Sequence, residues 1–536
     1  MSRRRGGSRT SVGRGTGDLG PFVERPATMS PMRRAPSRSH PSARKDVALP
    51  TALAAVAALL LPACGGAPSA PALPADAPNV LLVQVDTLRV DRLGFAGHDR
   101  PTSPAMDELA ARSLVFDRAY APSPWTLPSM ASIHTGLYPS SHGLQRPKDA
   151  IPPEARTLAE VLAQAGYRTD SIVANFLVNP YFGHSQGFAT FDTEDAKGDQ
   201  HVSTPGVTAR ALDLLADYAD DAPEDGPFFL SLLYFDPHYD WLAHGLGFAA
   251  DGPVGRLTGE ETIDELRELA ATGEGMTDAE VDELRARYDE EIALTDGGIG
   301  QLLAALDTLG LADDTLVVLT ADHGEEFLEH GWLGHTRFLY EGMVHVPLLV
   351  HDPRATGSFG THVDTVVSTV SVMPTVLDLV GLDPELHGPD EPSLADFVRK
   401  PFLADALQPH DHGLDERVDG RVFLEVDFVP TQEKNLAKVA HLQGVVSRDL
   451  KWIVDTETGA VEAYDLRDDP GETRNLAPAW LAGDDPADAT TAAAMQRFLD
   501  AWRAACVERA LPRHQGNWSE EELDQLSKLG YLDSGE

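Results

Sequence analysis

Short runs of consecutive apolar residues, separated by segments with helical periodicity, restrict what this chain of 536 residues can fold into. The apolar runs lie at 79–86, 169–175, 228–236 and 315–322. Such runs are typical of strands that are buried on both faces of a parallel sheet. The helical segments lie between them, at 103–116, 157–166 and 278–309. This alternation predicts βαβ units, and hence an α/β fold with a doubly wound, mostly parallel sheet.

The pattern changes after about residue 410, where short strands with alternating polar and apolar residues follow one another. The segments RVFLEVDF, LQGVVS and KWIVD are typical of antiparallel strands, and helical segments near 488–505 and 519–529 follow them. We therefore expect a main domain at 79–410 and a smaller antiparallel α+β subdomain with closing helices at 411–536.

The first 63 residues differ in composition from the rest of the chain. They contain 11 Lys and Arg but only 3 Asp and Glu, and the basic part precedes the apolar run VALPTALAAVAALLLPAC. That run is shorter than the roughly 20 residues of a membrane-spanning helix, which favours a signal peptide with a long basic n-region at 1–63. A start of translation at Met29 or Met32 would shorten this n-region.

The apolar run ends in Leu61-Pro-Ala-Cys64, which resembles a bacterial lipobox and implies that Cys64 is lipidated. An ordinary cleaved signal peptide with a coincidental cysteine is the alternative. Residues 64–78 have the composition of a linker. Cys506 is the one other cysteine, so a lipidated Cys64 leaves no pair for an intramolecular disulfide. We therefore expect an exported lipoprotein, held at a membrane surface on the periplasmic or cell-surface side.

Acidic residues dominate the sequence as a whole. The chain has 84 Asp and Glu against 43 Lys and Arg, which gives a net charge of −41. Such a surface repels phosphate backbones, so the composition argues against a nucleic-acid-binding protein. It leaves the oligomeric state open.

Three of the predicted strands end at or near side chains that can bind metal ions, and the run at 228–236 is the one followed by His238. Asp86 follows the first apolar run, and Asp322 and His323 follow the last one. Because ligands gather beyond the carboxyl ends of strands in open α/β sheets, we expect these side chains to converge. Carboxylate and imidazole together favour Mn²⁺ or Zn²⁺ slightly over Ca²⁺ or Mg²⁺. An aspartate at a strand end can also cap a helix, which is the alternative for Asp86.

The segment TADHGEEFLEHGWLGH adds Glu325, Glu326, His330 and His335 to Asp322 and His323. An acidic loop with incidental histidines is the alternative interpretation of this segment. The two glutamates are expected to shape the loop by hydrogen bonding. A second metal would need further ligands, for which Asp236, His238 and His335 are candidates. The sequence therefore leaves open whether the site holds one metal ion or two.

Six motifs follow one another along the chain: VDTLRVDRLG, TLPSMASIHTG, FDPHYD, TADHGEE, LYEGMVHVPLLV and AYDLRDDPGETRNLA. Together they make the chain resemble the sulfatase family of the alkaline phosphatase superfamily over residues 79–476. The resemblance implies a divalent metal bound by Asp86, Asp322 and His323. It also places the family's Cys-x-Pro-Ser-Arg motif at 126–130, so that Thr126 takes the position of the nucleophile, in contact with the metal.

The chain departs from the family at three positions. Thr126 replaces the cysteine, Met130 replaces the motif arginine, and Thr87 replaces a second metal-binding acid. Sulfatases oxidise the cysteine to formylglycine, whose hydrate expels sulfate by collapsing to the aldehyde, and threonine cannot do this. A hydroxyl at a metal and a helix N-terminus can still attack phosphorus, as in phosphodiesterase and phosphotransferase branches of the superfamily. The alternative for Thr126 is a helix N-cap in a degenerate site.

The resemblance implies substrate contacts as well. Asn175 stands where the family has a Lys-x-His pair, His238 matches a histidine near the leaving group, and His335 lies near a usual lysine. Either histidine could protonate a departing oxygen near neutral pH, and the alternative is that each lies in a surface loop. Arg89 and Arg337 are candidates to bind substrate oxygens, with local ion pairing as the alternative.

These features predict a metal-dependent hydrolase of a sulfate or phosphate ester, with diesterase-like phosphoester chemistry favoured by the threonine. The substrate would be an anionic ester derived from a glycan or a lipid, and the segment 239–277 would form part of the pocket rim. One alternative is a transferase that passes a phospho group to a glycan or lipid. The other is an inactive binding protein that keeps the sulfatase fold.

Overall fold

The computed structural model describes the following parts of the chain: residues 73–198, 201–220, 226–355, 360–400, 420–429, 439–516, 518–520 and 523. The predicted signal peptide, Cys64 and most of the predicted helix at 519–529 lie outside these residues. None of the described helices combines the length and the apolar character that crossing a bilayer requires.

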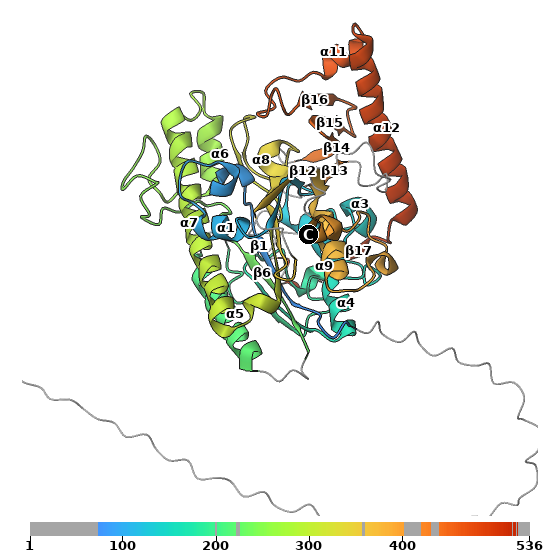
Figure 1. Cartoon of the computed structure of the whole chain (residues 1–536). Coiled ribbons are helices and arrows are strands. Elements are labelled where there is room, and N and C mark those ends of the chain that lie inside the picture. The colour runs from blue at the N-terminus through green and yellow to red at the C-terminus, as the bar shows by residue number, and fades with distance from the viewer. Residues whose placement is uncertain are drawn as a thin grey trace, which may run out of the picture. The chain divides into compact units, whose positions relative to one another are not determined.

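A nine-stranded sheet lies at the centre of the fold (Figure 1). Its strand order is β10-β2-β11-β7-β1-β6-β4-β5, and β12 pairs with β2. The strands are β1 (Asn79–Val85), β2 (Leu114–Tyr120), β4 (Arg168–Val173), β5 (Thr190–Asp192), β6 (Phe228–Tyr234), β7 (Thr315–Ala321), β10 (His345–Val346), β11 (Leu348–His351) and β12 (Thr361–Ser368). The strands β7, β1, β6, β4 and β5 are mutually parallel, whereas β11 is antiparallel to β7 and to β2. The predicted mostly parallel sheet is thus confirmed.

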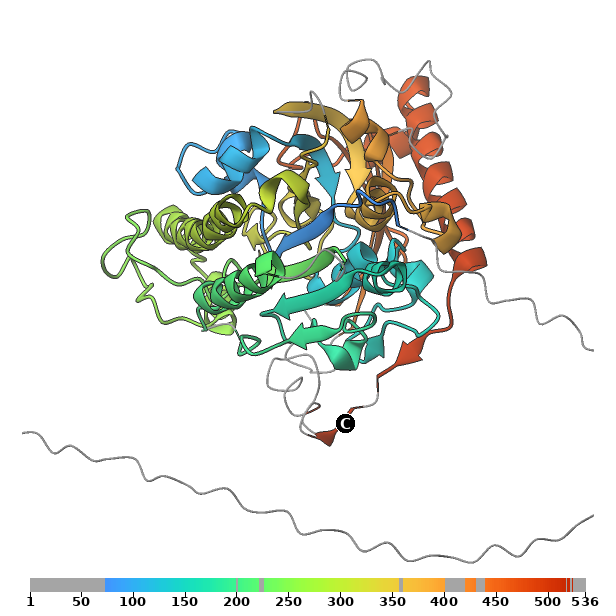
Figure 2. The same ribbon diagram turned by 60° about the horizontal axis from the view of Figure 1, so that its bottom comes forward.

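Helices cover both faces of this sheet. Alternate residues of β1 accordingly pack in two different hydrophobic clusters, one on each face. Leu81 and Val83 pack with α1 (Pro104–Ala110), α5 (Thr204–Asp220) and α7 (Asp278–Leu309). Val80 and Leu82 pack with α2 (Thr126–Thr135), α4 (Leu158–Ala165), α9 (Val372–Leu379) and α10 (Ala395–Arg399). In Figures 1 and 2, the green helices and the orange helices lie on opposite sides of the sheet. The fold is therefore doubly wound.

A four-stranded antiparallel sheet forms the smaller subdomain, as predicted. It consists of β13 (Arg421–Phe428), β14 (Ala440–Ser447), β15 (Leu450–Asp455) and β16 (Val461–Asp465). The helices α11 (Ala477–Ala482) and α12 (Pro486–Arg509) pack on it through Trp452 and Trp502. The buried Lys451 joins this sheet to the main domain, because its Nζ lies 2.7 Å from Glu341 Oε1 and 2.8 Å from Glu472 Oε1.

The remaining described α-helices and strands are short. They are α3 (Pro139–His142), α6 (Ile263–Ala271), α8 (Glu341–Val344), β3 (Asp149–Ala150), β8 (Glu326–Phe327), β9 (Leu333–Gly334) and β17 (His514–Gln515). Of these, α6 lies within the predicted pocket rim.

The predicted helix at 103–116 is wrong in its second half. The helix ends at Ala110, and the run that begins at Leu114 continues as β2 to Tyr120. The apolar residues of this run pair with β11 and β12, so tertiary contacts select a strand over the helical pattern. Ser103 does stand at the N-cap of α1, but its hydroxyl donates to Asp107, and Asp296 of α7 accepts the backbone N–H groups of the first turn.

Candidate active site

Three side chains with metal-binding atoms meet at the carboxyl ends of two central strands. Asp86 follows β1, and Asp322 and His323 follow β7, which pairs with β1 in parallel so that Val85 lies opposite Ala321. One potential ligand atom from each of the three residues lies within 4.8 Å of the others. All three side chains are fully buried. The structure therefore brings together the three residues that the sequence analysis proposed as ligands.

Hydrogen bonds orient this group. Asp322 Oδ1 accepts the backbone N–H of Thr87 at 3.2 Å and that of His323 at 2.9 Å. The Nδ1 of His323 lies 2.9 Å from the carbonyl oxygen of Gly324, which requires Nδ1 to carry the proton. Burial lowers the pKa of His323, so its imidazole stays neutral with a lone pair on Nε2. A neutral imidazole fixed by its other nitrogen is the form that binds metals.

The group fits a divalent cation, since its carboxylates carry buried negative charge with incomplete partners. Asp322 Oδ2 and the neighbouring Thr87 Oγ1 are buried and make no hydrogen bond among the described residues. Leaving such atoms without a partner is costly, and a cation would offset that cost. No second group of three candidate ligands occurs in the parts of the chain that the structure describes. Asp236, a candidate for a second metal, instead accepts the N–H groups of Ser203 and Thr204 at the start of α5.

Thr126 is the first residue of α2 and lies beside the three candidate ligands. Its Oγ1 is 3.3 Å from Nε2 of His323 and 3.4 Å from Nδ2 of Asn175, which also donates to Asp86 Oδ2 at 2.5 Å. Trp125 occupies the N-cap and makes no side-chain capping bond. The alternative in which Thr126 serves as N-cap is therefore wrong.

The start of α2 is also joined directly to the end of β7. The hydroxyl of Ser129 donates to the carbonyl oxygen of Asp322 at 2.5 Å. This bond fixes the helix that carries Thr126 relative to the loop that carries His323. The N-terminus of α2 additionally directs its positive dipole end toward this region.

His238 and His335 lie beside the same group. The ring centroid of His335 is 4.6 Å from that of His323 and 4.9 Å from that of His238. His238 Nδ1 donates to the carbonyl of Tyr239 at 2.8 Å, and His335 Nδ1 is 3.0 Å from Glu325 Oε1. Both histidines are buried, so the alternative that they lie in surface loops is wrong.

Glu325 was expected only to shape its loop, and the structure gives it a defined partner in His335. Its side chain is fully buried, and burial raises the pKa of this carboxyl to about 8. Nothing in the sequence pattern singles it out from Glu326, which accepts the backbone N–H of His330 instead.

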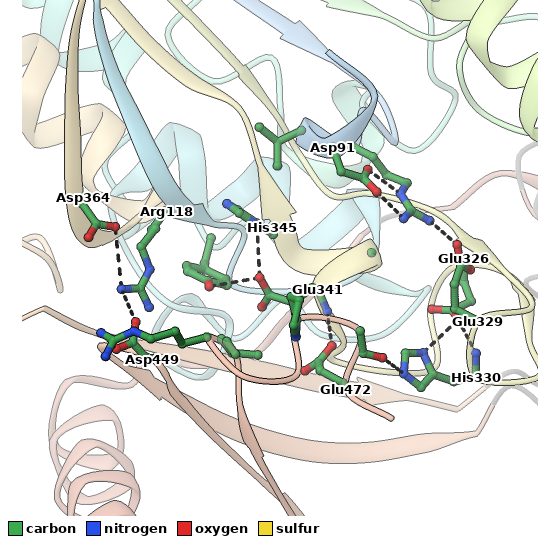
Figure 3. Close-up of a pocket in the computed structure, with 18 residues that line it drawn as sticks. Asp91, Arg118, Glu326, Glu329, His330, Glu341, His345, Asp364, Asp449 and Glu472 are labelled. Carbon is green, nitrogen blue, oxygen red and sulfur yellow. Dashed lines mark hydrogen bonds and ion pairs between the residues drawn. The ribbon is translucent and has the colours of Figure 1, made fainter. Parts of the chain in front are cut away.

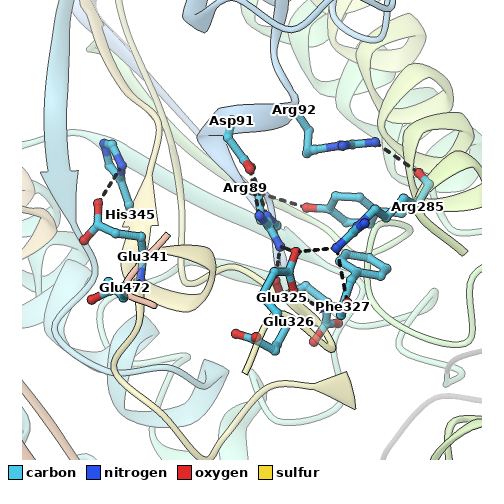
Figure 4. Close-up of polar contacts among 12 residues, drawn as sticks. Arg89, Asp91, Arg92, Arg285, Glu325, Glu326, Phe327, Glu341, His345 and Glu472 are labelled. Carbon is cyan, nitrogen blue, oxygen red and sulfur yellow. Dashed lines mark hydrogen bonds and ion pairs between the residues drawn. The ribbon is translucent and has the colours of Figure 1, made fainter. Parts of the chain in front are cut away.

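Arg89 is bound by acids and not directed at Thr126. Its Nε and Nη2 donate to the carboxylate of Asp91 at 2.9 and 2.7 Å, as Figure 4 shows. Its Nη1 donates to the carbonyl of Glu325 at 2.8 Å and to Glu329 at 3.1 Å. These contacts support the ion-pairing alternative for Arg89.

Arg337 and His330 also face other parts of the fold. The guanidinium carbon of Arg337 is 5.0 Å from the ring centroid of Trp332 and 5.0 Å from that of Phe338. Arg337 lines a cavity of about 230 Å³ together with residues of β14 and β15. His330 stacks on Tyr340 at 3.8 Å between ring centroids.

A cavity of about 530 Å³ lies between the main domain and the antiparallel sheet (Figure 3). Its lining includes Glu341 and Glu472, and Arg118, which forms ion pairs with Asp364 and Asp449. Neither Thr126 nor any of the three candidate ligands lines this cavity, so the candidate metal site lies outside it.

Comparison with known proteins decides the family. The family profile described as "Sulfatase" matches residues 78–382, more than half of the chain. The chain belongs to the sulfatase family. As a sulfatase-family hydrolase, it carries Asp86, Thr126, Asp322 and His323 at the positions that the motif resemblance assigns to the reaction centre.

Sulfatases from bacteria are among its relatives. The arylsulfatase of Clostridium perfringens is 24% identical over 456 residues, which cover 74% of this chain and 90% of that protein. The N-acetylglucosamine-6-O-sulfatase of Bacteroides thetaiotaomicron is 24% identical over 386 residues, 57% of this chain and 68% of that protein. The phosphonate monoester hydrolase of Agrobacterium radiobacter superimposes with a TM-score of 0.62 at 22% identity, covering 80% of this chain and 96% of that structure. These likenesses confirm the alkaline-phosphatase-like fold.

Proposed function

We propose that this sulfatase-family protein hydrolyses an anionic phosphate or sulfate ester with Thr126 as nucleophile, and that it prefers phosphoesters. The observation that carries the proposal is the position of Thr126 Oγ1, 3.3 Å from Nε2 of His323 at the start of α2. A hydroxyl beside metal-binding side chains and at a helix N-terminus is placed for attack on a phosphoryl group.

Asp86, Asp322 and His323 would hold the divalent cation. Mn²⁺ and Zn²⁺ suit this donor set slightly better than Ca²⁺ or Mg²⁺. When bound, the cation would supply positive charge that polarises the ester oxygens and favours ionisation of a nearby hydroxyl. Asn175 donates to both Asp86 and Thr126, and so fixes the nucleophile relative to the ligands.

The proposed reaction has two steps. In the first, Thr126 Oγ1 loses its proton to solvent and forms a bond to phosphorus, while the bond from phosphorus to the alcohol oxygen breaks. His238 or His335 donates a proton to that departing oxygen. In the second step, water attacks phosphorus and gives a proton to the same histidine, and the threonine oxygen leaves and regains its proton. Glu325 holds Nδ1 of His335, so that Nε2 is the nitrogen available for this exchange.

The preference for phosphorus follows from the second step. A threonyl sulfate lacks the hemiacetal through which a formylglycine enzyme expels sulfate, whereas water can displace threonine from phosphorus. The name of the relative that acts on N-acetylglucosamine 6-O-sulfate supports a glycan-derived substrate.

The test compares Thr126→Ala and Thr126→Ser with the wild type on an aryl phosphate monoester, an aryl phosphate diester and an aryl sulfate, each with Mg²⁺, Ca²⁺, Mn²⁺ and Zn²⁺ supplied separately. We expect Thr126→Ala to lose at least about a hundredfold in kcat with an unchanged melting temperature, because the nucleophile is gone. Thr126→Ser should keep part of the activity. Full turnover by Thr126→Ala would show that the nucleophile is another group.

A further inference from the structure

Arg267, a residue that the motifs do not include, lies at the edge of the proposed active site. It is in the middle of α6, whose N-terminal capping box includes Thr262 and whose first N–H, that of Ile263, is accepted by Asp240. Ile263 and Leu266 are buried, so one face of the helix packs inward. The helix thus presents Arg267 to β9, the strand that precedes His335.

The guanidinium is held in place by rings and by one backbone oxygen. Its carbon is 5.4 Å from the ring centroid of Tyr239 and 5.0 Å from that of Trp332, and its Nε donates to the carbonyl of Leu333 at 2.8 Å. A Cβ at Gly334 would lie 2.2 Å from Nη2, so a larger residue there would displace the guanidinium from its present position.

The donors at the tip of Arg267 make one ion pair but no hydrogen bond within the described structure. Both Nη1 and Nη2 are buried and make no hydrogen bond among the described residues. Nη1 forms an ion pair with Oδ1 of Asp264 at 3.7 Å, too long for a hydrogen bond, and the Asp264 side chain is 53% exposed against 14% for Arg267. Buried guanidinium donors without acceptors are costly, and a fork of two such groups matches the oxygens of a carboxylate, sulfate or phosphate.

The position of Arg267 indicates which part of a substrate it would meet. Tyr239 stacks on His335 at 4.8 Å between ring centroids, and His335 is 4.6 Å from His323. In this series of contacts, two rings lie between the guanidinium and the candidate metal ligand. The group that Thr126 attacks would lie at the ligand end of the series, so Arg267 faces the alcohol part of the substrate.

We propose that Arg267 binds a second anionic group of the substrate, carried by the alcohol part and distinct from the ester that is cleaved. The substrate class is thus an ester of an alcohol that bears an additional carboxylate, sulfate or phosphate. This inference rests on the proposed function for the location of the cleaved ester. Arg267 is then a specificity-determining residue.

The test measures binding of two ligands that cannot be hydrolysed, benzenesulfonate and 4-sulfobenzoate, to the full chain in the presence of Mn²⁺. The sulfonate stands for the transferred group, and the carboxylate of 4-sulfobenzoate stands for the second anion. Calorimetry should give at least about tenfold tighter binding of 4-sulfobenzoate by the wild type. Arg267→Gln should remove this preference and leave benzenesulfonate binding within about twofold, while Arg267→Lys should retain part of the preference.

The control variant is Arg399→Gln, which removes an arginine that is paired with Asp378 at the end of α10. It should behave as the wild type. Equal binding of the two ligands by the wild type would overturn the inference, as would a preference that survives in Arg267→Gln. If the proposed chemistry is wrong, Thr126→Ala will still turn over substrate. That measurement is independent of ligand binding by the Arg267 variants, so the two proposals can fail separately.

Discussion

Thr87, directly after the candidate ligand Asp86, has an unusual backbone. Its φ is 52°, a region that β-branched residues rarely adopt. Its N–H donates to Asp322 Oδ1, and its carbonyl accepts the hydroxyl of Tyr288 at 2.6 Å. These bonds hold a conformation that costs of order 1–3 kcal/mol. The position therefore combines a left-handed backbone with a hydroxyl, where the motif resemblance implies a carboxylate.

Thr87→Asp tests this interpretation. Aspartate tolerates the left-handed region better than threonine and would add a carboxylate next to Asp86. We expect divalent cation affinity to rise by about tenfold, because affinity for hard cations increases with the number of charged ligands. Titration calorimetry with Mn²⁺ measures the change, and Thr87→Ser serves as the control that adds no charge. An unchanged affinity would mean that the side chain at this position points away from the cation.

The sequence predicted some of these residues and missed others for a definite reason. Asp86, Asp322 and His323 could be found because each ends a buried strand, and neighbouring parallel strands end at the same edge of the sheet. Glu325 and Arg267 could not, because their place depends on how the loop after β7 and the segment around α6 fold over that edge. Hydrophobic periodicity along the sequence does not encode how such loops fold.

At the level of elements, buried carboxylates of α7 hold the loop that precedes α6. Glu290 accepts the backbone N–H groups of His244, Gly247, Phe248 and Ala249 at 2.6 to 3.0 Å. Glu280 forms an ion pair with Arg256 and accepts its N–H. The acidic stripe of this helix therefore organises a loop, and is not simply a solvated face.

Glu290→Ala should release this loop. Its removal leaves four N–H donors without their acceptor, and we expect cleavage by a protease between 242 and 256 to accelerate by about tenfold or more. Hydrogen exchange of the same amides should accelerate in parallel. Glu290→Gln, which keeps one acceptor oxygen, should show a smaller effect. Equal protease resistance of Glu290→Ala and the wild type would show that the loop is held by other contacts.

The elements themselves could largely be predicted where pattern and burial agree. The helix at 278–309 has the predicted limits, and the strand from Asn79 ends at Val85, one residue before the end of the predicted run, because both have capping or strand signals within their own sequence. The strand β2 was missed because its residues 114–116 continue the pattern of α1. Pairing with β11 and β12 determines its conformation, and the sequence contains no local signal for those partners.

For the whole molecule, the net negative charge and the buried protonated acids both make the folded state less stable as the pH rises. Burial raises the pKa of Glu425 to about 7 and that of Asp296 to about 6. The folded state therefore keeps these protons to higher pH than the unfolded state, and stability falls as pH rises from roughly 4 to 7. The net charge of −41 adds self-repulsion as the acids ionise.

At low pH a different carboxyl group matters. Burial alone would raise the pKa of Glu261, but hydrogen bonds from Thr258 lower it to about 2, so stability also falls in strong acid.

The melting temperature should therefore be higher near about pH 5.5 than near about pH 8.5. Glu425→Gln should raise it at the higher pH and change it little at the lower one, since Gln can still accept the N–H of Ser140. Scanning calorimetry at two salt concentrations separates the causes, because salt screens surface repulsion but not a buried carboxylate. If Glu425→Gln melts lower than the wild type near about pH 8.5, the ionised carboxylate stabilises the fold instead.

The residues of the candidate site are far apart in the sequence, which has a consequence for biosynthesis. Its residues extend from Asp86, directly after the first strand, to His335, and Ser129 joins the helix that carries Thr126 to the strand end that holds Asp322. A nascent polypeptide emerging from the ribosome therefore possesses only one of the three candidate cation ligands until β7 has been made. Premature capture of an ion by all three ligands, and reaction with any ester, are excluded during most of elongation.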